Sequence, residues 1–593
     1  MGIVYRATDR RTGNVVALKQ VTTSGYEDAE TYRLALAREF QTLAGLRHPH
    51  IISVLDYGFD QEKQPFFTMA YLPQKQNILE AAKNKSLSHK VELIHQLLQA
   101  LSYLHRRGVL HCDLKPDNVL VLNDQVRLLD FGLSTHERFT SSSIGGSLPY
   151  SAPELFEGGS LSQSADLYAV GVLFYQMVKG EHPFAPFDYT FVNRVVSKEP
   201  DLIHLDERAK PFLEKLLNKK PEGRFTSAST ALKFLTQSVD LQLPVETHAT
   251  RESFLQAATF IGREFELEQL QNALSETKIE GSAVWLLGGE SGVGKSRLLE
   301  EIQTHALVDG WQVWRGQAVE SGQLPYQLWR EIVPNIALNI DLSEIEASIL
   351  KQIYPQIDSL LDQHIPTIAS STNSDDQERL VLTLVETIKR QAHPTLILLE
   401  DLQWARESLA PLSQMLQLSN LLQNVLVIGT YRSDESPTIP DELSGAKSLQ
   451  LNRLTEPEIQ QLSQAMLGEQ ASNTEIQSLL TQETEGNTFF IVEVIRTLAE
   501  EAGDLNEVGQ MNLPAEILTS GMESLVHRRT EKISPDDQPL LQLAAVAGRQ
   551  IDTALLKQLD PAQNVSRWLQ RGQDAALLIF RDGQWQFSHD KFR

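Results

Sequence analysis

Six short motifs in a fixed order constrain what the first 237 residues of this 593-residue chain can fold into. Each motif alone is common strand, helix or turn sequence, but six in this order and at these spacings are very improbable by chance. The motifs are VALK at 16–19, YRLALAREFQTLAGL at 32–46, HCDLKPDN at 111–118, DFG at 130–132, APE at 152–154 and PEGRF at 221–225. They predict a fold that gathers charged residues from distant parts of the chain.

The first two motifs place a lysine and a glutamate where they can pair. VALK is a short apolar strand that ends on Lys19. In the second motif, Leu36 and Leu43 repeat at helical spacing, with Glu39 three residues after the first and four before the second. Glu39 therefore faces inward beside the apolar stripe, and we expect it to form an ion pair with Lys19.

The next two motifs supply the groups that transfer of a phosphoryl group from ATP requires. Asp113 would orient the acceptor hydroxyl and accept its proton, and Lys115 would neutralise the γ-phosphate. Asn118 and Asp130 would bind Mg²⁺ through their side-chain oxygens. The order and chemistry of these residues predict an ATP site.

On these motifs, residues 1–237 resemble the eukaryotic-like serine/threonine protein kinases of the bacterial type. The resemblance implies a two-lobed protein kinase fold, the cofactors ATP and Mg²⁺, and protein substrates with Ser or Thr acceptors. It adds nucleotide-binding positions at Gly2, Val4, Ala17 and Met69, with Met69 as the gatekeeper. It also implies structural roles for Asp166, for a Glu154–Arg224 ion pair, and for Ser147 as a bridge between Asp113 and Lys115.

Two departures from the family pattern are visible. The glycine-rich loop is represented only by its end, with Gly2 at the third glycine and Val4 at the valine, so we expect a fragment or a misplaced start. Cys112, the only cysteine, replaces the arginine that in the family contacts a phosphate on the activation loop. A thiol cannot supply that charge-assisted contact, so we expect control by some other route.

This expectation concerns five hydroxyl residues of the activation segment: Thr135, Thr140, Ser141, Ser142 and Ser143. Their replacement by alanine should leave activity largely intact. For Cys112 itself, a small buried filler and a redox or nucleophilic group are the two interpretations, and the adjacent Asp113 disfavours a thiolate.

A second nucleotide-binding signature follows in GGESGVGKS at 288–296, between an apolar strand and a helical stretch. The pattern G-x-x-x-x-G-K-S runs from Gly289 through Gly294 to Ser296, and the strand–loop–helix context makes it specific. Backbone N–H groups would cradle phosphates, Lys295 would reach the β and γ oxygens, and Ser296 would bind Mg²⁺. We expect a P-loop ATPase fold with a parallel sheet.

Two later strands carry further candidates for this second site. PTLILLEDLQWA ends on Glu400 and Asp401, either of which could serve the metal, and NVLVIGTYRSDE delivers Arg432 to the same edge of the sheet. With FIGREFELEQL, these segments resemble the signal-transduction ATPases with numerous domains, an AAA-related group, over residues 259–593. Thr488 in GNTFF stands where such modules often carry Pro. Slow hydrolysis and a nucleotide-state switch both fit this pattern.

The expected division is a kinase domain at 1–237, a linker at 238–258 marked by Pro244 and polar residues, an ATPase core at 259–437, a helical lid at 438–512 without strands of note, and a truncated winged-helix-like segment at 513–593. The last segment has ten Lys plus Arg and ten Asp plus Glu, which gives it no basic face. DNA binding is therefore the minority interpretation there.

Composition narrows the function classes. A net charge of −24 opposes general attraction to nucleic acid, and no apolar run reaches the length of a membrane span. A lone cysteine fits a reducing cytosol, so we expect a cytoplasmic protein. The leading hypothesis is a serine/threonine kinase fused to a regulatory ATPase switch with capacity for self-association. The alternatives are a kinase-like scaffold whose ATPase recruits partners and a winged-helix transcriptional regulator.

Overall fold

The structure is a computed structural model that describes residues 2–588 with internal gaps. The gaps are 22–28, 61–63, 131–147, 240–246, 257–259, 320–324, 368–373, 468–470, 472, 504–507, 509–529, 531–532, 549, 560–564, 576 and 582–583. Within these described ranges, none of the helices combines the length and the apolar character needed to cross a lipid bilayer.

The chain begins with a four-stranded antiparallel sheet and one long helix. The elements are β1 (Gly2–Thr8), β2 (Val15–Val21), α1 (Ala29–Ala44), β3 (Val54–Phe59) and β4 (Pro65–Ala70), with strand order β1-β2-β4-β3. Strands rich in Val, Phe and Tyr fit such a half-covered sheet. Leu36, Phe40 and Leu43 of α1 are buried, so the apolar stripe predicted for this helix lies in the core.

A mainly helical lobe follows. Its elements are β5 (Gln76–Asn77), α2 (Ile78–Ala82), α3 (Leu87–Arg106), β6 (Val119–Leu122), β7 (Gln125–Leu128), α4 (Pro153–Phe156), α5 (Gln163–Lys179), α6 (Phe191–Ser197), α7 (Lys210–Leu216) and α8 (Ala228–Val239). Helix α5 is buried along nearly its whole length. Ser162 caps its N-terminus, because the Ser162 hydroxyl accepts a hydrogen bond from the Ala165 N–H, and Gly180, with φ 88°, caps its C-terminus.

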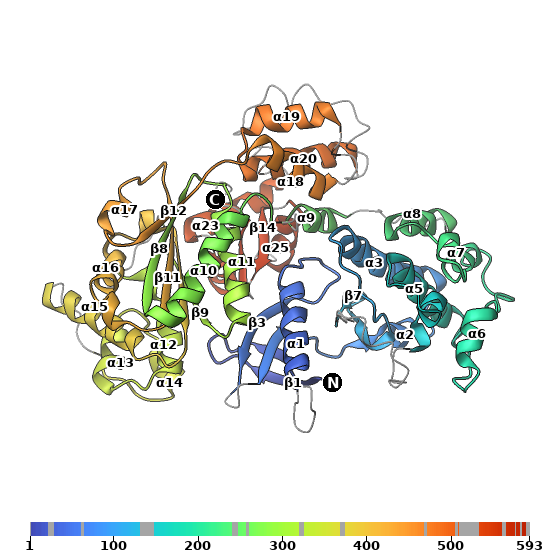
Figure 1. The fold of residues 1–593 in the computed structure, drawn as a ribbon, viewed down its shortest axis with the longest axis horizontal. Coiled ribbons are helices and arrows are strands. Elements are labelled where there is room, and N and C mark those ends of the chain that lie inside the picture. Colours follow the sequence, from blue (N-terminus) through green and yellow to red (C-terminus); the bar gives the residue numbers. More distant parts are fainter. Residues whose placement is uncertain are drawn as a thin grey trace.

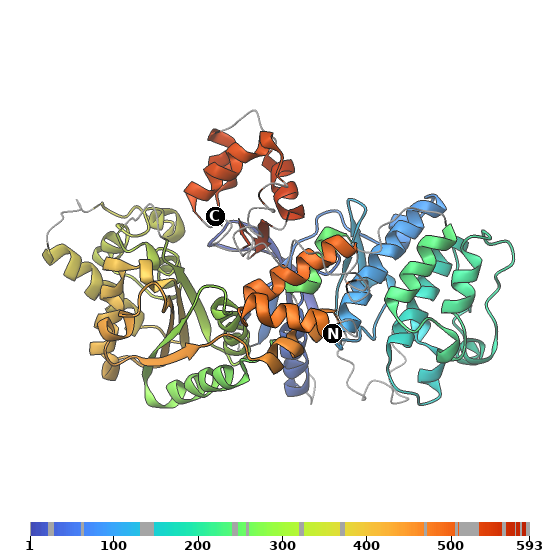
Figure 2. The ribbon, with the colours of Figure 1, turned by 90° about the horizontal axis from the view of Figure 1, so that it is seen from above.

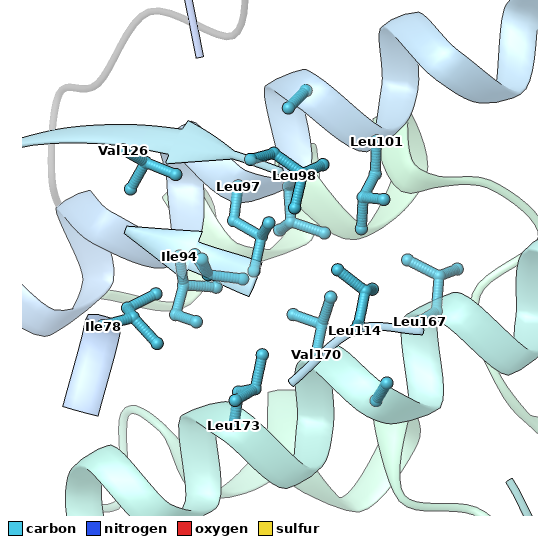
Figure 3. Close-up of a cluster of buried hydrophobic side chains, with 14 of the residues drawn as sticks. Ile78, Ile94, Leu97, Leu98, Leu101, Leu114, Val126, Leu167, Val170 and Leu173 are labelled. Atoms are coloured by element: carbon cyan, nitrogen blue, oxygen red, sulfur yellow. The ribbon is translucent and has the colours of Figure 1, made fainter. Parts of the chain in front are cut away.

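Figure 3 shows the core of this lobe, where leucine and valine side chains of α3 and α5 meet. Leu97, Leu101, Leu167 and Val170 are fully buried there. Leu114, which lies in the HCDLKPDN motif, packs among them. The catalytic-loop sequence is thus anchored in the core by its own apolar residue.

The segment expected to be a plain linker contains a buried helix, α9 (His248–Gln256). Glu252 and Arg251 are buried although both are charged. The Arg496 guanidinium donates two hydrogen bonds to the Glu252 carboxylate, at 2.7 and 2.6 Å, and Arg251 donates to the Gly503 carbonyl. Because these partners are about 250 residues away, the local hydrophobic pattern gives no sign of burial.

The next unit is a five-stranded parallel sheet flanked by helices. Its elements are α10 (Glu264–Glu280), β8 (Ser282–Gly289), α11 (Lys295–Val308), β9 (Gln312–Gln317), α12 (Val333–Asn339), α13 (Glu344–Leu350), α14 (Ile357–Leu361), α15 (Ser374–Lys389), β10 (Thr395–Glu400), α16 (Ala410–Gln417), β11 (Val425–Arg432), α17 (Ile439–Glu442) and β12 (Lys447–Leu451). The strand order is β12-β8-β11-β10-β9. Strands β10 and β11 are buried almost throughout, as central parallel strands are.

Strand β12 corrects the expectation that residues 438–512 hold no strand. It pairs in parallel with β8, so the sheet extends to Leu451 and beyond the expected boundary at 437. Its sequence, KSLQL, mixes exposed polar residues with a single buried leucine because it lies at the sheet edge. Such a short edge strand carries a weak sequence signal.

The remaining elements form two small units. Helices α18 (Glu456–Leu467), α19 (Thr474–Thr484) and α20 (Thr488–Ala502) share one core, and the C-terminal unit contains α23 (Gln538–Ala547), β13 (Gln550–Ile551), α24 (Thr553–Leu559), α25 (Val565–Asp574), β14 (Leu578–Arg581) and β15 (Gln584–Phe587). Figures 1 and 2 show the two-lobed N-terminal unit beside the parallel-sheet unit, with α1 and α11 facing each other where they meet.

Candidate active sites

The lysine and glutamate predicted to pair do so. The Lys19 ammonium on β2 lies 2.7 Å from the Glu39 carboxylate on α1 and 2.6 Å from the Asp130 carboxylate. The Lys19 and Glu39 side chains are only 12% and 13% exposed, whereas Asp130 is 44% exposed. One cation thus joins a strand, a helix and the DFG motif.

Burial and charge compete at this cluster. Burial alone would lower the pKa of the Lys19 ammonium, but the carboxylates of Glu39 and Asp130 outweigh it and raise the pKa above its ordinary value. Lys19 therefore stays charged at neutral pH. Burial, together with the neighbouring Asp130 carboxylate, raises the pKa of Glu39 despite the attraction of Lys19.

The other predicted nucleotide-binding positions share one face of the small sheet. Val4 lies opposite Lys19 in the β1–β2 ladder, and Ala17 lies opposite Met69 in the β2–β4 ladder. Opposed residues share a face, and Ala17 and Lys19 are two residues apart on one strand, so all four face the same side. Gly2 is the first residue of β1 and lies opposite Val21.

The residues of the HCDLKPDN motif converge on one carboxylate. Lys115 donates to the Asp113 carboxylate at 2.8 Å, and the Asn118 amide donates to the same carboxylate at 3.1 Å and to the Asp113 carbonyl at 2.8 Å. The His111 ring is fully buried and contacts the Leu129 carbonyl next to Asp130. This contact therefore fixes the position of the Asp113 loop relative to Asp130.

Asp166 fixes the backbone of this loop. Its carboxylate accepts from the N–H groups of His111 and Cys112, both at 2.9 Å, and contacts the His105 ring at 3.0 Å. Burial alone would raise the pKa of Asp166, but the His105 and backbone contacts lower it overall. Cys112 has φ 62°, a conformation that non-glycine residues adopt at a cost. The carboxylate thus holds a strained backbone just before Asp113.

The predicted Glu154–Arg224 pair is present. The Arg224 guanidinium, whose side chain is wholly buried, binds both oxygens of the Glu154 carboxylate at 2.8 and 2.7 Å. It also donates to the carbonyls of Asn218 and Lys219. Ser147 and the activation-segment hydroxyl residues lie outside the described residues, so the predicted Ser147 bridge stays a prediction.

The second signature forms a loop between β8 and α11. Gly294 precedes the helix with φ 104°, and Gly292 has φ 90°, conformations that favour glycine. A side chain at Gly292 would meet the Asn487 amide at 2.7 Å. The Lys295 ammonium donates to the carbonyls of Gly289 and Glu290 at 2.7 and 2.9 Å. Burial lowers the pKa of Lys295 to about 8.

The two candidate acids at the end of β10 point in different directions. The Ser296 hydroxyl donates to the Glu400 carboxylate at 2.9 Å, and Arg315 binds the other oxygen of that carboxylate at 2.6 Å. Asp401 instead accepts from the amides of Gln317 and Gln403. Because Ser296 is the expected metal-binding hydroxyl, this geometry favours Glu400 over Asp401 beside the ion.

Arg432 lies at the end of β11 and is not a solvated charge. Its side chain is 12% exposed, its guanidinium lies 4.6 Å from the centre of the Trp404 ring, and it approaches Asp401 at 3.9 Å. Its positive charge is one of the influences that lower the pKa of Lys295. Arg432 also lies opposite Gly289 in the β8–β11 ladder, so it stands at the edge of the sheet where the loop begins.

Contacts from α20 were missed by the sequence interpretation, which singled out only Thr488. The Asn487 amide donates to the Ser291 carbonyl at 3.0 Å, and the Phe489 N–H donates to the Gly292 carbonyl at 3.0 Å. Arg453 also bridges Glu290 of the loop and Glu485. The helical unit thus closes directly over the phosphate-binding loop. The Asn residues before α19 and α20 read as ordinary helix caps, which hides the second role of Asn487.

Both sites fit ATP and Mg²⁺ by the chemistry of their donors. Carboxylate, amide and hydroxyl oxygens are the hard ligands that Mg²⁺ prefers, and Asn118 with Asp130, and Ser296 with Glu400, supply them. The positive φ values of Gly292 and Gly294 give the second loop the tight backbone turn that a phosphate-binding loop at a helix N-terminus needs.

Comparison with known proteins supports both assignments. Residues 1–235 match the family described as protein kinase domain, and residues 259–428 match the family described as AAA ATPase domain. The chain is 31% identical to an Aurora kinase of Schizosaccharomyces pombe over 38% of this chain and 65% of that protein, and 31% identical to Aurora kinase B of Mus musculus over 39% and 68%. It is 33% identical to serine/threonine-protein kinase pkn3 of Myxococcus xanthus over 43% and 50%.

The matched stretch is therefore less than two thirds of two of these three relatives. The two resemblances predicted from the motifs, to protein kinases and to AAA-related ATPases, are confirmed, as are a kinase fold and a P-loop unit in one chain.

Proposed function

Because this chain belongs to the protein kinase family and also carries an AAA-type ATPase domain, we propose that it is an ATP-dependent serine/threonine protein kinase whose activity responds to the nucleotide state of the ATPase. The observation that carries the kinase proposal is the convergence of Lys19, Glu39 and Asp130 in one cluster beside the Asp113 loop. The substrates are proteins with Ser or Thr acceptors. The cofactors are ATP and Mg²⁺.

Each residue has a definite task in this reaction. Lys19, held by Glu39, binds the α- and β-phosphates of ATP. The oxygen of the substrate hydroxyl bonds to the γ-phosphorus while Asp113 accepts the hydroxyl proton. The bond between the γ-phosphorus and the bridging oxygen of the β-phosphate breaks, which releases ADP. Lys115 neutralises charge on the transferred group. Mg²⁺, held by Asn118 and Asp130, would shield the phosphate charges.

The test is transfer of label from γ-labelled ATP by the full chain. Asp113→Asn keeps the shape but removes the proton acceptor, and we expect a loss on the order of a hundredfold or more. Asp117→Asn is the matched control, because Asp117 lies in the same loop and is exposed. Equal labelling by wild type and Asp113→Asn would contradict the kinase proposal.

The ATPase site would bind ATP with Lys295, Ser296 and Glu400 and hydrolyse it slowly. Ser296→Ala and Glu400→Gln should both reduce phosphate release when measured in an Asp113→Asn background, which silences the first site. Glu344→Gln, an exposed carboxylate of α13, is the control. Unchanged release in both variants would show that this loop does not hydrolyse ATP.

The switch part of the proposal is supported by a continuous set of contacts. Residues before and at the start of α20 contact the phosphate-binding loop, and Arg496 farther along α20 binds Glu252 of α9. From α9, the Phe254 ring contacts Tyr103 and Arg106 of α3 in the kinase unit. A nucleotide that moved α20 would therefore act on both units. Lys295→Ala should change the kinase rate; an identical rate at all ATP concentrations would refute the switch.

The scaffold alternative predicts self-association that depends on ATP but no phosphoryl transfer, and size-exclusion chromatography with and without nucleotide distinguishes it.

For the C-terminal unit we propose a winged-helix-like fold, supported by its order of helix, strand, two helices and two strands and by the antiparallel β13-β15-β14 sheet. Its role would be packing against the ATPase. Retention on duplex DNA at physiological salt would instead favour the regulator alternative.

A further inference from the structure

The helix that carries Glu39 is covered on one side by the kinase core and on another by the ATPase. Leu36, Phe40 and Leu43 of α1 are buried in the first core. Helix α1 also contacts α11, the helix that begins with Lys295 and Ser296 (Figure 1). Helices that meet side by side fix each other's position through their packed side chains. The position of Glu39 therefore depends on a neighbour from the other unit.

The contact between the kinase unit and the ATPase unit has an apolar part, to which three aromatic rings that touch in series lead from α1. Phe40, next to Glu39, packs on Tyr57 of β3 at 4.9 Å between ring centres, and Tyr57 meets Phe59 at 5.6 Å. The Phe59 ring lies over Gly310, where a side-chain carbon would come within 3.5 Å of it. Leu307, near the end of α11, is 6% exposed and belongs to the buried cluster of the kinase unit.

The contact also has a polar part. The Arg47 guanidinium, just after α1, lies 3.6 Å from the Glu300 carboxylate on α11. In the β1–β2 turn, Arg11 donates to the Asn335 side chain at 3.1 Å and Arg10 donates to the Leu360 carbonyl at 3.3 Å. One exposed ion pair and two hydrogen bonds contribute little to the free energy of association, but they fix how the two surfaces are aligned.

From these contacts we propose that the face formed by Glu300, Leu307 and Gly310 of the ATPase is the docking surface for α1 together with its neighbours Arg47 and Phe59, and that docking holds Glu39 in the position where it pairs with Lys19. The inference rests on the proposed function and adds to it the site through which the ATPase controls the kinase. In the docked arrangement the Lys19–Glu39 pair is closed at 2.7 Å. At a rise of 1.5 Å per residue, the docking surface begins at Glu300, about 8 Å from Lys295, and continues past the end of the helix, about 21 Å from its start.

The decisive experiment is a charge swap in the full chain, read by amide hydrogen exchange of α1 and by the KM for ATP of the kinase reaction. Arg47→Glu sets like charges against each other, and we expect roughly three- to tenfold faster exchange in residues 29–44 and a similar rise in KM. Arg47→Glu combined with Glu300→Arg should restore part of both values, because Glu300 also pairs with Arg297 at 3.3 Å. Arg38→Glu, an exposed residue of the same helix, is the control.

A second variant tests the apolar part without disturbing a buried core. Phe59→Ala removes a ring that is 41% exposed, and we expect exchange in α1 and in residues 300–313 to rise together by roughly threefold. The exchange measurement does not need an active kinase, so it separates this inference from the proposed function. Unchanged exchange in both variants, or failure of the double charge swap to restore it, would overturn the docking proposal even if phosphoryl transfer is observed.

Discussion

The Asp166 carboxylate offers the sharpest test of how the catalytic loop is held. Asp166→Asn preserves the shape but turns one acceptor oxygen into an amide that faces a backbone N–H of His111 or Cys112. The variant loses one charge-assisted hydrogen bond, about 1.5–3 kcal/mol, and leaves a buried donor unsatisfied, about 1–3 kcal/mol. The free energy of local opening should fall by roughly 3 kcal/mol. This corresponds to about a hundredfold faster amide exchange across residues 111–118.

Amide exchange of the full chain under native conditions measures this directly, with the exposed Asp117→Asn as the matched control. The kinase kcat should fall with the loop's order, while exchange in the parallel-sheet unit stays at its wild-type rate. Wild-type exchange across residues 111–118 in Asp166→Asn would refute the claim that this carboxylate holds the loop.

Three further predictions concern other parts of the chain. The pKa of Lys295 lies near 8, below its ordinary 10.5, so the folded protein loses this positive charge as pH rises through about 8. Binding of a fluorescent ATP analogue to a Lys19→Ala variant should weaken above that pH. The same profile in a further Lys295→Arg variant would contradict the assignment, because arginine stays charged. Arg224→Ala removes the partner of the Glu154 carboxylate, whose side chain is 14% exposed, and should lower the free energy of unfolding by about 3 kcal/mol, visible as a lower temperature of thermal unfolding. An added Glu154→Ala should recover part of that loss, and strictly additive effects would argue against a coupled pair. A variant with alanine at the five activation-segment hydroxyl residues should keep most of the kinase activity. Near-total loss would mean that these hydroxyl residues control activity although Cys112 replaces the arginine.

The sequence predicted the parts of the two sites in which local order determines chemistry. The motifs led us to expect Lys19, Asp113, Asn118 and Asp130 near one another, because phosphoryl transfer requires those residue types. The structure places Lys19 against Asp130 and Asn118 against Asp113, and their roles in the reaction stay predictions. The sequence could not rank Glu400 and Asp401, because both follow the same strand. The ranking depends on which side chain turns toward Ser296, a difference of backbone conformation at Asp401, where φ is 60°.

Features built from distant partners escaped prediction for a common reason. Helix α9 reads as polar linker because its charged residues are satisfied by Arg496 and Gly503, far along the chain. Strand β12 reads as loop because an edge strand needs little apolar sequence. The role of Asn487 is likewise invisible without the approach of α20 to Gly292. Hydrophobic periodicity reports local burial, not pairing between remote charges.

Helix α9 also determines how the protein can be divided for study. A truncated form that stops at residue 237 strips the Phe254 ring from Tyr103 and Arg106 and leaves bare apolar surface on α3. A form that starts at 259 leaves the Arg496 guanidinium with Glu493 but without the Glu252 carboxylate, which accepts two hydrogen bonds from it in the full chain. Both fragments would lose the contacts that α9 makes. A fragment prepared for expression should therefore include α9 together with the unit that is kept.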